Sequence, residues 1–266
     1  VRIETNYYEK RMINYFLLAY QGFDYFSKKF DKKKYPNTTL RIIDNGNQKI
    51  TGYEIYNTKN NIGCAGGWNL ICYIGFEYLG LEKIIIGQED TIVEENEMKE
   101  LLEICNENTI GTLIKPHFEF STFALHKKTF IKIGIFDENC IDAYCEDADY
   151  KQRCYLNEIK IENLNKPVER NFGISRKINK RIYDTIALNR TYIKQKWGTS
   201  INKDDLSFRD EQPPYEFKNP FNKNNLETNF IPITERMRVI QDLKNNMIPS
   251  QSEIAKLLID PQGIKK

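Results

Sequence analysis

Short apolar segments with the length of β-strands alternate with segments of helical periodicity through the first half of the chain. The strand-like segments are residues 13–20, 40–44, 53–56 and 83–86, and the helical ones are 23–30, 68–79 and 98–105. This alternation, with short connections, predicts a mostly parallel α/β sheet flanked by helices. Ligands of such sheets bind beyond the carboxyl ends of the strands, so we expect functional residues there.

Polar residues follow three of the predicted strands at these ends. Ala19 and Tyr20 end the first strand, Asp44 ends the next before an Asn-Gly pair, and Gly87-Gln-Glu-Asp90 follows three consecutive isoleucines. Carboxylate oxygens at such a place are candidate ligands of a divalent cation. Taken alone, Asp44 is more typical of a turn. Asp90 could be a helix N-cap, but its place after three consecutive isoleucines favours a functional site.

A glycine-rich segment precedes the helix that ends before Gly80. It contains Asn61, Gly63, Gly66 and Gly67. Because glycines have no side chain, backbone N–H groups can approach a ligand closely, and the amides at a helix N-terminus favour an anion. We therefore expect a phosphate-bearing ligand here, although a tight turn before a helix would also need glycine.

The middle of the chain carries an acidic cluster. After a strand-like segment at 118–125, the stretch 142–149 contains Glu146, Asp147 and Asp149 and precedes a predicted helix. A carboxylate can accept the proton of an attacking hydroxyl, and repulsion among clustered carboxylates can raise the pKa of one of them. The alternative is that these acids only favour the first turn of a helix.

A cationic amphipathic helix is predicted over residues 176–196. Seven of its side chains are basic and only Asp184 is acidic, while isoleucines recur at helical spacing. Arg176 and Lys177, together with Arg153 beyond the acidic cluster, offer positive charge to a departing diphosphate. A run of this kind is more often a solvated helix face.

Four segments in this order resemble those of glycosyltransferase family 2, in particular its rhamnosyltransferase-like branch. They are Ile42-Ile-Asp-Asn-Gly46, Asn61-Ile-Gly-Cys-Ala-Gly-Gly-Trp-Asn69, Gln88-Glu-Asp90, and Gly134-Ile-Phe-Asp-Glu138 with Glu146-Asp-Ala-Asp149. The similarity spans roughly Met12 to Gly198. It implies a GT-A fold, a nucleotide-diphosphate sugar donor, a divalent cation, and transfer with inversion at the anomeric carbon.

The resemblance implies roles for individual residues on the donor side. Asp44, with Ala19 and Tyr20, matches the residues that meet the nucleobase or ribose. Asp90 matches the last acid of the Asp-x-Asp signature, which holds Mn²⁺ or Mg²⁺, while Gln88 stands where the first acid would be. The other donor-binding residues that it implies are Asn61, Gly63, Gly66, Gly67, Glu89, Arg176 and Lys177.

On the acceptor side, Asp147 matches the general base, with Glu146, Asp149 and Arg153 in supporting positions. The implied reaction is a single displacement without a covalent enzyme intermediate. It requires the carboxylates of Asp90 and Asp147 to converge on one site. It also requires that neither carboxylate lies in a closed internal salt bridge.

Three other functions are weighed against this one. A non-catalytic nucleotide-sugar or glycan-binding module is favoured by Gln88, which removes one charge from the predicted metal site. A transferase acting on hydroxylated bases in DNA would use the cationic helix along phosphates. A nicotinamide-dependent dehydrogenase is disfavoured, because no Gly-x-Gly-x-x-Gly follows the first strand.

Composition limits the partners and the location. Lys and Arg number 39 against 37 Asp and Glu, so overall charge gives no reason to expect a polyanionic partner. No apolar run approaches the roughly 20 residues of a membrane span, and cytoplasmic residence is expected. The acceptor implied is a glycan, a lipid-linked sugar or a similar hydroxyl compound.

The remaining expectations concern residues outside these motifs. Six cysteines without a Cys-x-x-Cys pair are expected to be reduced and structural. His117 and His126 precede the acidic cluster and are expected to be structural or peripheral. We divide the chain into a transferase domain, 1–198, and an irregular and helical C-terminal appendage, 199–266, for packing or homo-oligomerisation.

Overall fold

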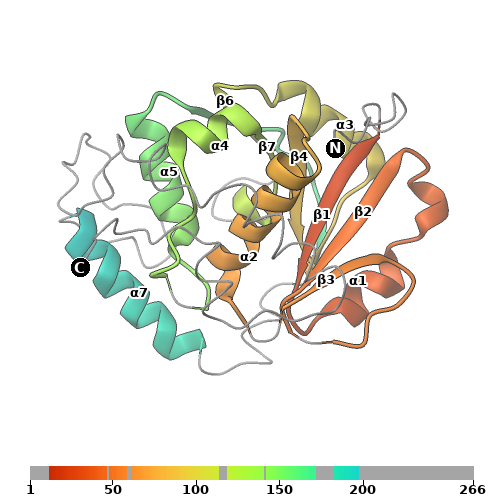
Figure 1. Cartoon of the computed structure of the whole chain (residues 1–266), viewed down its shortest axis with the longest axis horizontal. Helices are drawn as coiled ribbons and strands as arrows, with labels where there is room; N and C mark the ends of the chain where they lie inside the picture. Colours follow the sequence, from red (N-terminus) through yellow and green to blue (C-terminus); the bar gives the residue numbers. More distant parts are fainter. Residues whose placement is uncertain are drawn as a thin grey trace.

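The computed structural model of the chain describes residues 12–46, 48–58, 61–113, 119–140, 142–171 and 182–197. A seven-stranded mixed sheet lies at its centre, with the strand order β3-β2-β1-β4-β7-β6-β8 (Figure 1). Neighbouring strands are parallel from β3 to β4, β7 is antiparallel to both its neighbours, and β8 is parallel to β6. The strands are β1 (Ile13–Ala19), β2 (Thr38–Asp44), β3 (Glu54–Asn57), β4 (Lys83–Gln88), β6 (Thr109–Thr112), β7 (Thr122–His126) and β8 (Lys160–Asn163).

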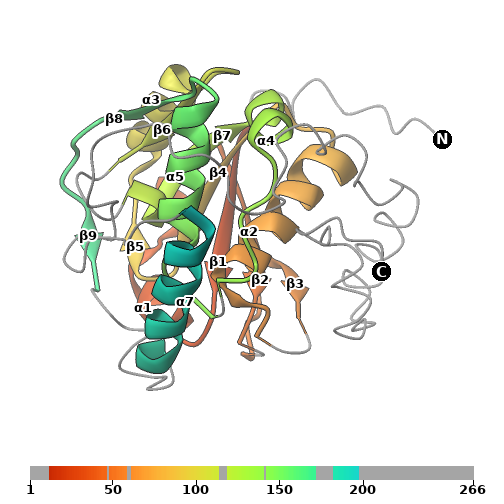
Figure 2. The same ribbon diagram turned by 90° about the vertical axis from the view of Figure 1, so that its left-hand side faces the viewer.

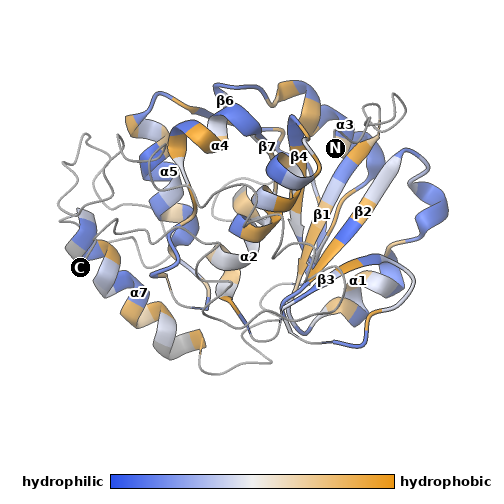
Figure 3. Cartoon of the chain, in the orientation of Figure 1, coloured by the Kyte–Doolittle hydropathy of each residue, from blue (hydrophilic) through white to orange (hydrophobic). Residues whose placement is uncertain are grey.

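Helices cover both faces of this sheet (Figure 2). On one face are α1 (Phe23–Lys29) and α3 (Glu95–Ile104), and on the other are α2 (Gly63–Cys72), its π-helical continuation Tyr73–Tyr78, α4 (Lys127–Ile133) and α5 (Glu146–Leu156). Successive residues of β1 point to opposite faces of the sheet. Tyr15 and Leu17 belong to the hydrophobic core on the side of α1 and α3, and Phe16 and Leu18 belong to the core on the side of α2, α4 and α5. The hydropathy colouring shows the apolar stretches of α2 and of the neighbouring strands (Figure 3).

Five further elements complete the described part. A two-stranded antiparallel ribbon joins β5 (Thr91–Ile92) to β9 (Glu169–Arg170), and α7 (Ile182–Trp197) lies against α5. Short 3₁₀ turns occupy Lys32–Lys34 and Glu119–Ser121. The contact between α7 and α5 has its own small core, made by Cys140, Cys145, Ala148, Ile193 and Trp197.

The α/β class, the mostly parallel sheet and the flanking helices confirm the expectation from the sequence. The strand predicted at 118–125 begins later than expected, because a 3₁₀ turn precedes β7. All six cysteines are free and buried, as expected. The predicted C-terminal appendage lies outside the described residues.

Among the described residues, no helix is long and apolar enough to cross a membrane.

Candidate functional site

The carboxyl ends of the central parallel strands meet at one edge of the sheet. Ala19 at the end of β1 pairs with Asp44 of β2, and Leu18 pairs with Gln88 at the end of β4. The backbone N–H of Asn45 donates to the carbonyl of Ala19 at 2.7 Å. The structure therefore brings together three of the predicted donor-binding positions.

Asp44 forms the turn that was the alternative interpretation of this residue. It is fully buried, and its Oδ1 accepts the backbone N–H of Gly46 at 3.1 Å. A Cβ at Gly46 would lie 1.2 Å from the carbonyl oxygen of Tyr20, so only glycine fits where the loops after β1 and β2 touch. The turn role is confirmed, and the predicted contact of Asp44 with a nucleotide stays a prediction.

Asn45, which sequence reasoning assigned only to the turn, connects this strand end to the start of α2. Its Nδ2 donates to Oδ1 of Asn61 at 2.9 Å and to the carbonyl of Gly63 at 3.1 Å. Its Oδ1 accepts the N–H of Ile62 at 2.8 Å. The Asn-Gly pair after β2 was the available signal, but its partner lies 16 residues away in the sequence.

The glycines at the start of α2 have conformational and packing reasons. Gly63 has a φ of +79°, in the left-handed region that favours glycine. A Cβ at Gly67 would lie 2.4 Å from Cδ1 of Leu18, so glycine lets α2 pack closely on β1.

The first two amides of α2 already have acceptors within the protein. The N–H of Gly63 donates to Oδ1 of Asn61 at 2.9 Å, and the N–H of Cys64 donates to the carbonyl of Asp142 at 2.6 Å. These two amides therefore do not fit the predicted diphosphate contact. The contacts predicted for Gly66 and Gly67 remain untested.

Cys64 links the end of β4 to the start of α5. Nε2 of Gln88 donates to Sγ of Cys64 at 3.5 Å, and the Cys64 thiol is hydrogen-bonded to the Glu146 carboxyl group. Burial, and secondarily the charge of Asp147, raises the pKa of Glu146 to about 8. Glu146 is therefore mostly protonated at neutral pH, whereas its neighbour Asp147 is half-buried and accepts the N–H of Ala148 at 2.8 Å.

The segment before α5 is held in an unusual backbone conformation. Asp142, Tyr144 and Cys145 have φ values of 59°, 76° and 80°, although none of them is glycine. Nδ2 of Asn189 on α7 donates to the carbonyls of Ala143 and Tyr144, both at 3.0 Å. Such strain persists only where the surroundings impose it, and it occurs often at functional sites. α7 thereby fixes the position of Glu146 and Asp147.

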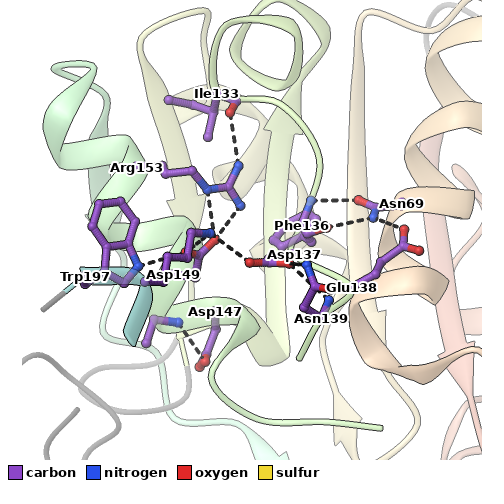
Figure 4. A network of polar contacts seen from close by, with 12 residues as sticks. Asn69, Ile133, Phe136, Asp137, Glu138, Asn139, Asp147, Asp149, Arg153 and Trp197 are labelled. Carbon is purple, nitrogen blue, oxygen red and sulfur yellow. Dashed lines mark hydrogen bonds and ion pairs between the residues drawn. The ribbon is translucent and has the colours of Figure 1, made fainter. Parts of the chain in front are cut away.

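Asp149 and Arg153 lie in a buried network of polar contacts (Figure 4). Oδ2 of Asp149 accepts Nε of Arg153 at 2.9 Å, and Oδ1 accepts Nε1 of Trp197 at 2.9 Å. Nη1 of Arg153 donates to the carbonyl of Ile133 at 3.0 Å. Burial would raise the pKa of Asp149, but the charges of Lys196 and Arg153 outweigh it and lower the pKa. Asp149 thus has a structural role in this network, and its role in supporting a general base stays a prediction.

Two predicted cations of the site are instead internal. Arg153 was expected to offer charge to a diphosphate, but it is 5% exposed and is paired with Asp149. Lys196, one of the seven basic residues of the predicted cationic helix, has a fully buried side chain and contacts Asp137 at 2.8 Å and Asp149 at 2.5 Å. Arg176 and Lys177 lie outside the described residues.

The side chain of Asn69 connects the glycine-rich segment to the later Gly134–Glu138 segment by hydrogen bonds. Its side chain accepts the N–H of Phe136 at 2.8 Å and donates to the carbonyl of the same residue at 2.9 Å. It also donates to Glu138, and burial raises the pKa of this carboxyl group to about 8 (Figure 4). This side chain therefore ties α2 to the segment that leads toward α5.

Asp90 departs most from its predicted role. Its Oδ2 lies 3.1 Å from Nε of Arg170, with both side chains nearly buried, and its Oδ1 accepts Oγ1 of Thr91 at 2.9 Å. The condition that Asp90 stays out of an internal salt bridge therefore fails. The alternative N-cap role is wrong as well, because Glu94 caps α3 in a capping box with Glu97.

The residues around Asp90 do not fit a divalent cation as they are arranged. Both carboxylate oxygens accept hydrogen bonds from protein groups, and Gln88 is directed to Cys64. Within the described ranges, no three His, Cys, Asp or Glu side chains are grouped so as to hold a metal ion. The expectation of Mn²⁺ or Mg²⁺ stays a prediction.

Glu89 supports the loop that follows β1. Its Oε1 accepts the backbone N–H groups of Gln21 at 3.0 Å and Gly22 at 2.7 Å. Burial raises the pKa of this carboxyl group to about 7, against the opposing effect of these amides. Glu89 thus has a structural role in the loop beside Tyr20, whatever it contributes to a donor.

His126 is structural, as expected. Its Nδ1 accepts the N–H of Lys128 at 3.0 Å and so caps α4, while its Nε2 lies 3.1 Å from Glu82. His117 lies outside the described residues.

In comparisons with known proteins, no family model matches the chain and no curated protein matches it.

Proposed function

We propose that this protein is an inverting glycosyltransferase of the GT-A type, which moves a sugar from a nucleotide-diphosphate donor to an acceptor hydroxyl. The observation that carries the proposal is the link from Gln88 through Cys64 to Glu146. It joins the end of a central strand, the start of α2 and the acidic start of α5 at one edge of the sheet. The order of motifs that resembles glycosyltransferase family 2 supports the same conclusion.

Asp147 is the general base in this proposal, because its neighbour is unsuitable. Glu146 is 4% exposed, and its raised pKa keeps a proton on it at neutral pH. A general base must be deprotonated and within reach of the acceptor hydroxyl. Asp147 is half-buried, and it lies on the first turn of a helix whose preceding backbone is fixed by Asn189.

The proposed reaction is one displacement. The acceptor oxygen forms a bond to the anomeric carbon while its proton passes to the carboxylate of Asp147. The bond between the anomeric carbon and the donor phosphate oxygen breaks at the same time, and the nucleoside diphosphate leaves with the electron pair. A glycan or lipid-linked sugar is the proposed acceptor, and the cationic residues 176 and 177 are proposed to meet the departing diphosphate.

The test begins with a thermal-shift screen of nucleotide sugars, since a ligand that binds the native state raises the melting temperature. With a donor identified, Asp147→Asn is expected to lower kcat by about 10²- to 10⁴-fold and to leave donor affinity within twofold, as for the loss of a general base. The matched control is Glu146→Gln, which mimics the protonated neighbour and should retain most of the transfer activity.

Two results would count against the proposal. Full activity of the Asp147→Asn variant would reject the assignment of the base. Binding of a nucleotide sugar without transfer or hydrolysis, over a panel of glycan and lipid-linked acceptors, would instead identify a non-catalytic nucleotide-sugar-binding module.

A further inference from the structure

The Asp90 carboxylate, which the sequence assigned to a divalent cation, already has a positively charged partner. Nε of Arg170 lies 3.1 Å from Oδ2 of Asp90, and the two side chains are 8% and 10% exposed. Oδ1 of Asp90 accepts the hydroxyl of Thr91 at 2.9 Å. A cation bound at Asp90 would have to displace these contacts.

The fold determines the position of Arg170. The short ribbon of β5 and β9 pairs Thr91 with Arg170, and the N–H of Asn171 donates to the carbonyl of Asp90 at 2.8 Å. Since β5 follows β4 after only two residues, this pairing places the guanidinium directly beside the strand end. The Asp90–Arg170 pair is therefore built into the ribbon rather than formed by two freely moving surface side chains.

We propose that Arg170 takes the place of the divalent cation at the end of β4, so that the protein binds the diphosphate of its donor without metal. A guanidinium is well suited to this role, because it is permanently charged and its planar N–H groups match phosphate oxygens. The identity of the ligand rests on the proposed glycosyltransferase function. The pairing of Asp90 with Arg170, by contrast, can be tested without any donor.

The first experiment measures the binding of Mn²⁺ alone to the full chain by electron paramagnetic resonance and calorimetry. The wild type is expected to bind no Mn²⁺ at Asp90. The control is Lys29→Gln, which removes the exposed ion-pair partner of Glu169, the neighbour of Arg170 in β9, and it should likewise bind no Mn²⁺ at Asp90. Arg170→Gln frees one carboxylate oxygen of Asp90 and is expected to bind Mn²⁺ more strongly than the wild type, and adding Asp90→Asn should remove this increase. Mn²⁺ binding by the wild type that Asp90→Asn abolishes would overturn the proposal.

The second experiment measures the affinities for UDP, GDP, CDP and dTDP in excess chelator and again with Mn²⁺. Wild-type affinity should be equal in both conditions, whereas Arg170→Gln should bind about tenfold or more weakly in chelator, in line with the loss of a charged contact. Arg170→Lys keeps the charge and should lose less. Nucleotide binding that requires Mn²⁺ in the wild type, or that is unchanged in Arg170→Gln, would contradict the inference.

These outcomes separate the two proposals. If the wild type binds none of the four nucleotides in either condition, the glycosyltransferase proposal fails, while the Mn²⁺ measurements still decide the role of Arg170. If circular dichroism shows that Arg170→Gln is unfolded, nucleotide binding by Asp90→Asn tests the inference instead. The side-chain oxygen of the introduced Asn can still accept a hydrogen bond from Arg170, so this variant should fold. That variant should bind nucleotides with or without Mn²⁺, and a loss of binding in chelator alone would reject the inference.

Discussion

At the scale of single residues, the buried carboxyl groups of the site divide into charged and neutral ones according to their partners. Asp149 faces Lys196 and Arg153, and its pKa is lowered despite burial. Glu89 accepts the backbone amides of Gln21 and Gly22, and burial raises its pKa to about 7. A strong positive partner therefore decides which acid stays ionised, as expected where burial disfavours charge.

The raised pKa of Glu89 makes stability depend on pH. In the unfolded chain this group releases its proton near pH 4.5, whereas in the folded protein it keeps the proton until about pH 7. Because the unfolded state binds fewer protons between these values, the free energy of unfolding falls as pH rises from about 4.5 to 7.

We predict that Glu89→Gln removes about 1–3 kcal/mol of this pH-dependent loss, on the scale of 1.36 kcal/mol per pKa unit. Urea unfolding of the wild type and the variant at pH 5, 6, 7 and 8 measures it. Glu103→Gln is the matched control, since Glu103 is an exposed acid on α3. Parallel pH curves for the wild type and Glu89→Gln would show that Glu89 does not keep its proton in the native state.

At the scale of elements, α7 is attached to the rest of the protein by buried charges. Lys196 bridges Asp137 and Asp149, and Tyr192 donates to Asp137 at 2.8 Å. Two aspartates, one arginine and one lysine of this network carry no net charge together. Removing one member leaves an uncompensated buried charge, and this is what makes such networks sensitive.

Lys196→Met is accordingly expected to lower the free energy of unfolding by about 3–5 kcal/mol, the range for breaking a buried ion pair. Lys194→Met is the matched control, because Lys194 is exposed on the same helix and should change stability by less than about 0.5 kcal/mol. Guanidinium unfolding monitored by circular dichroism compares the two. Equal effects of both substitutions would mean that the buried contacts of Lys196 contribute little.

The elements also show what the sequence could and could not predict. Periodicity located the four parallel strands, because β1, β2 and β4 contain apolar runs and β3 has an alternating pattern. It did not indicate α4, which has only seven residues, three of them lysines, and depends on packing of Phe130 and Ile133. Nor did it indicate the pairing of β6 with β8, which joins segments far apart in the chain.

In the candidate site, too, local features were predictable from the sequence and non-local contacts were not. The strand ends that carry Ala19, Asp44 and Gln88 were predictable, since parallel strands place their carboxyl ends at one edge. The partners of the charged residues were not predictable, because they depend on non-local contacts. Asp90 meets Arg170 across 80 positions of sequence, and Asp137 meets Lys196 across 59.

At the scale of the whole molecule, the sheet separates two hydrophobic cores and makes the central strands the best-protected part. β1 and β4 lie in the middle of the sheet and contribute residues to both cores, while β3 and β8 are its edges. α7 joins this body through a small separate core and the buried charges around Asp149. The stability of these regions should therefore differ in a fixed order.

Native-state hydrogen exchange followed by mass spectrometry tests this order. We predict that amides of β1 and β4 exchange only on global unfolding, that those of β3 and β8 exchange earlier, and that α7 is protected as well as α5. Lys196→Met should accelerate exchange in α7 and in the first turn of α5, and leave β1 unchanged relative to global stability. If α7 of the wild type exchanges like an unstructured peptide while α5 stays protected, the buried charges do not hold it, and the fixed position proposed for Asp147 loses its support.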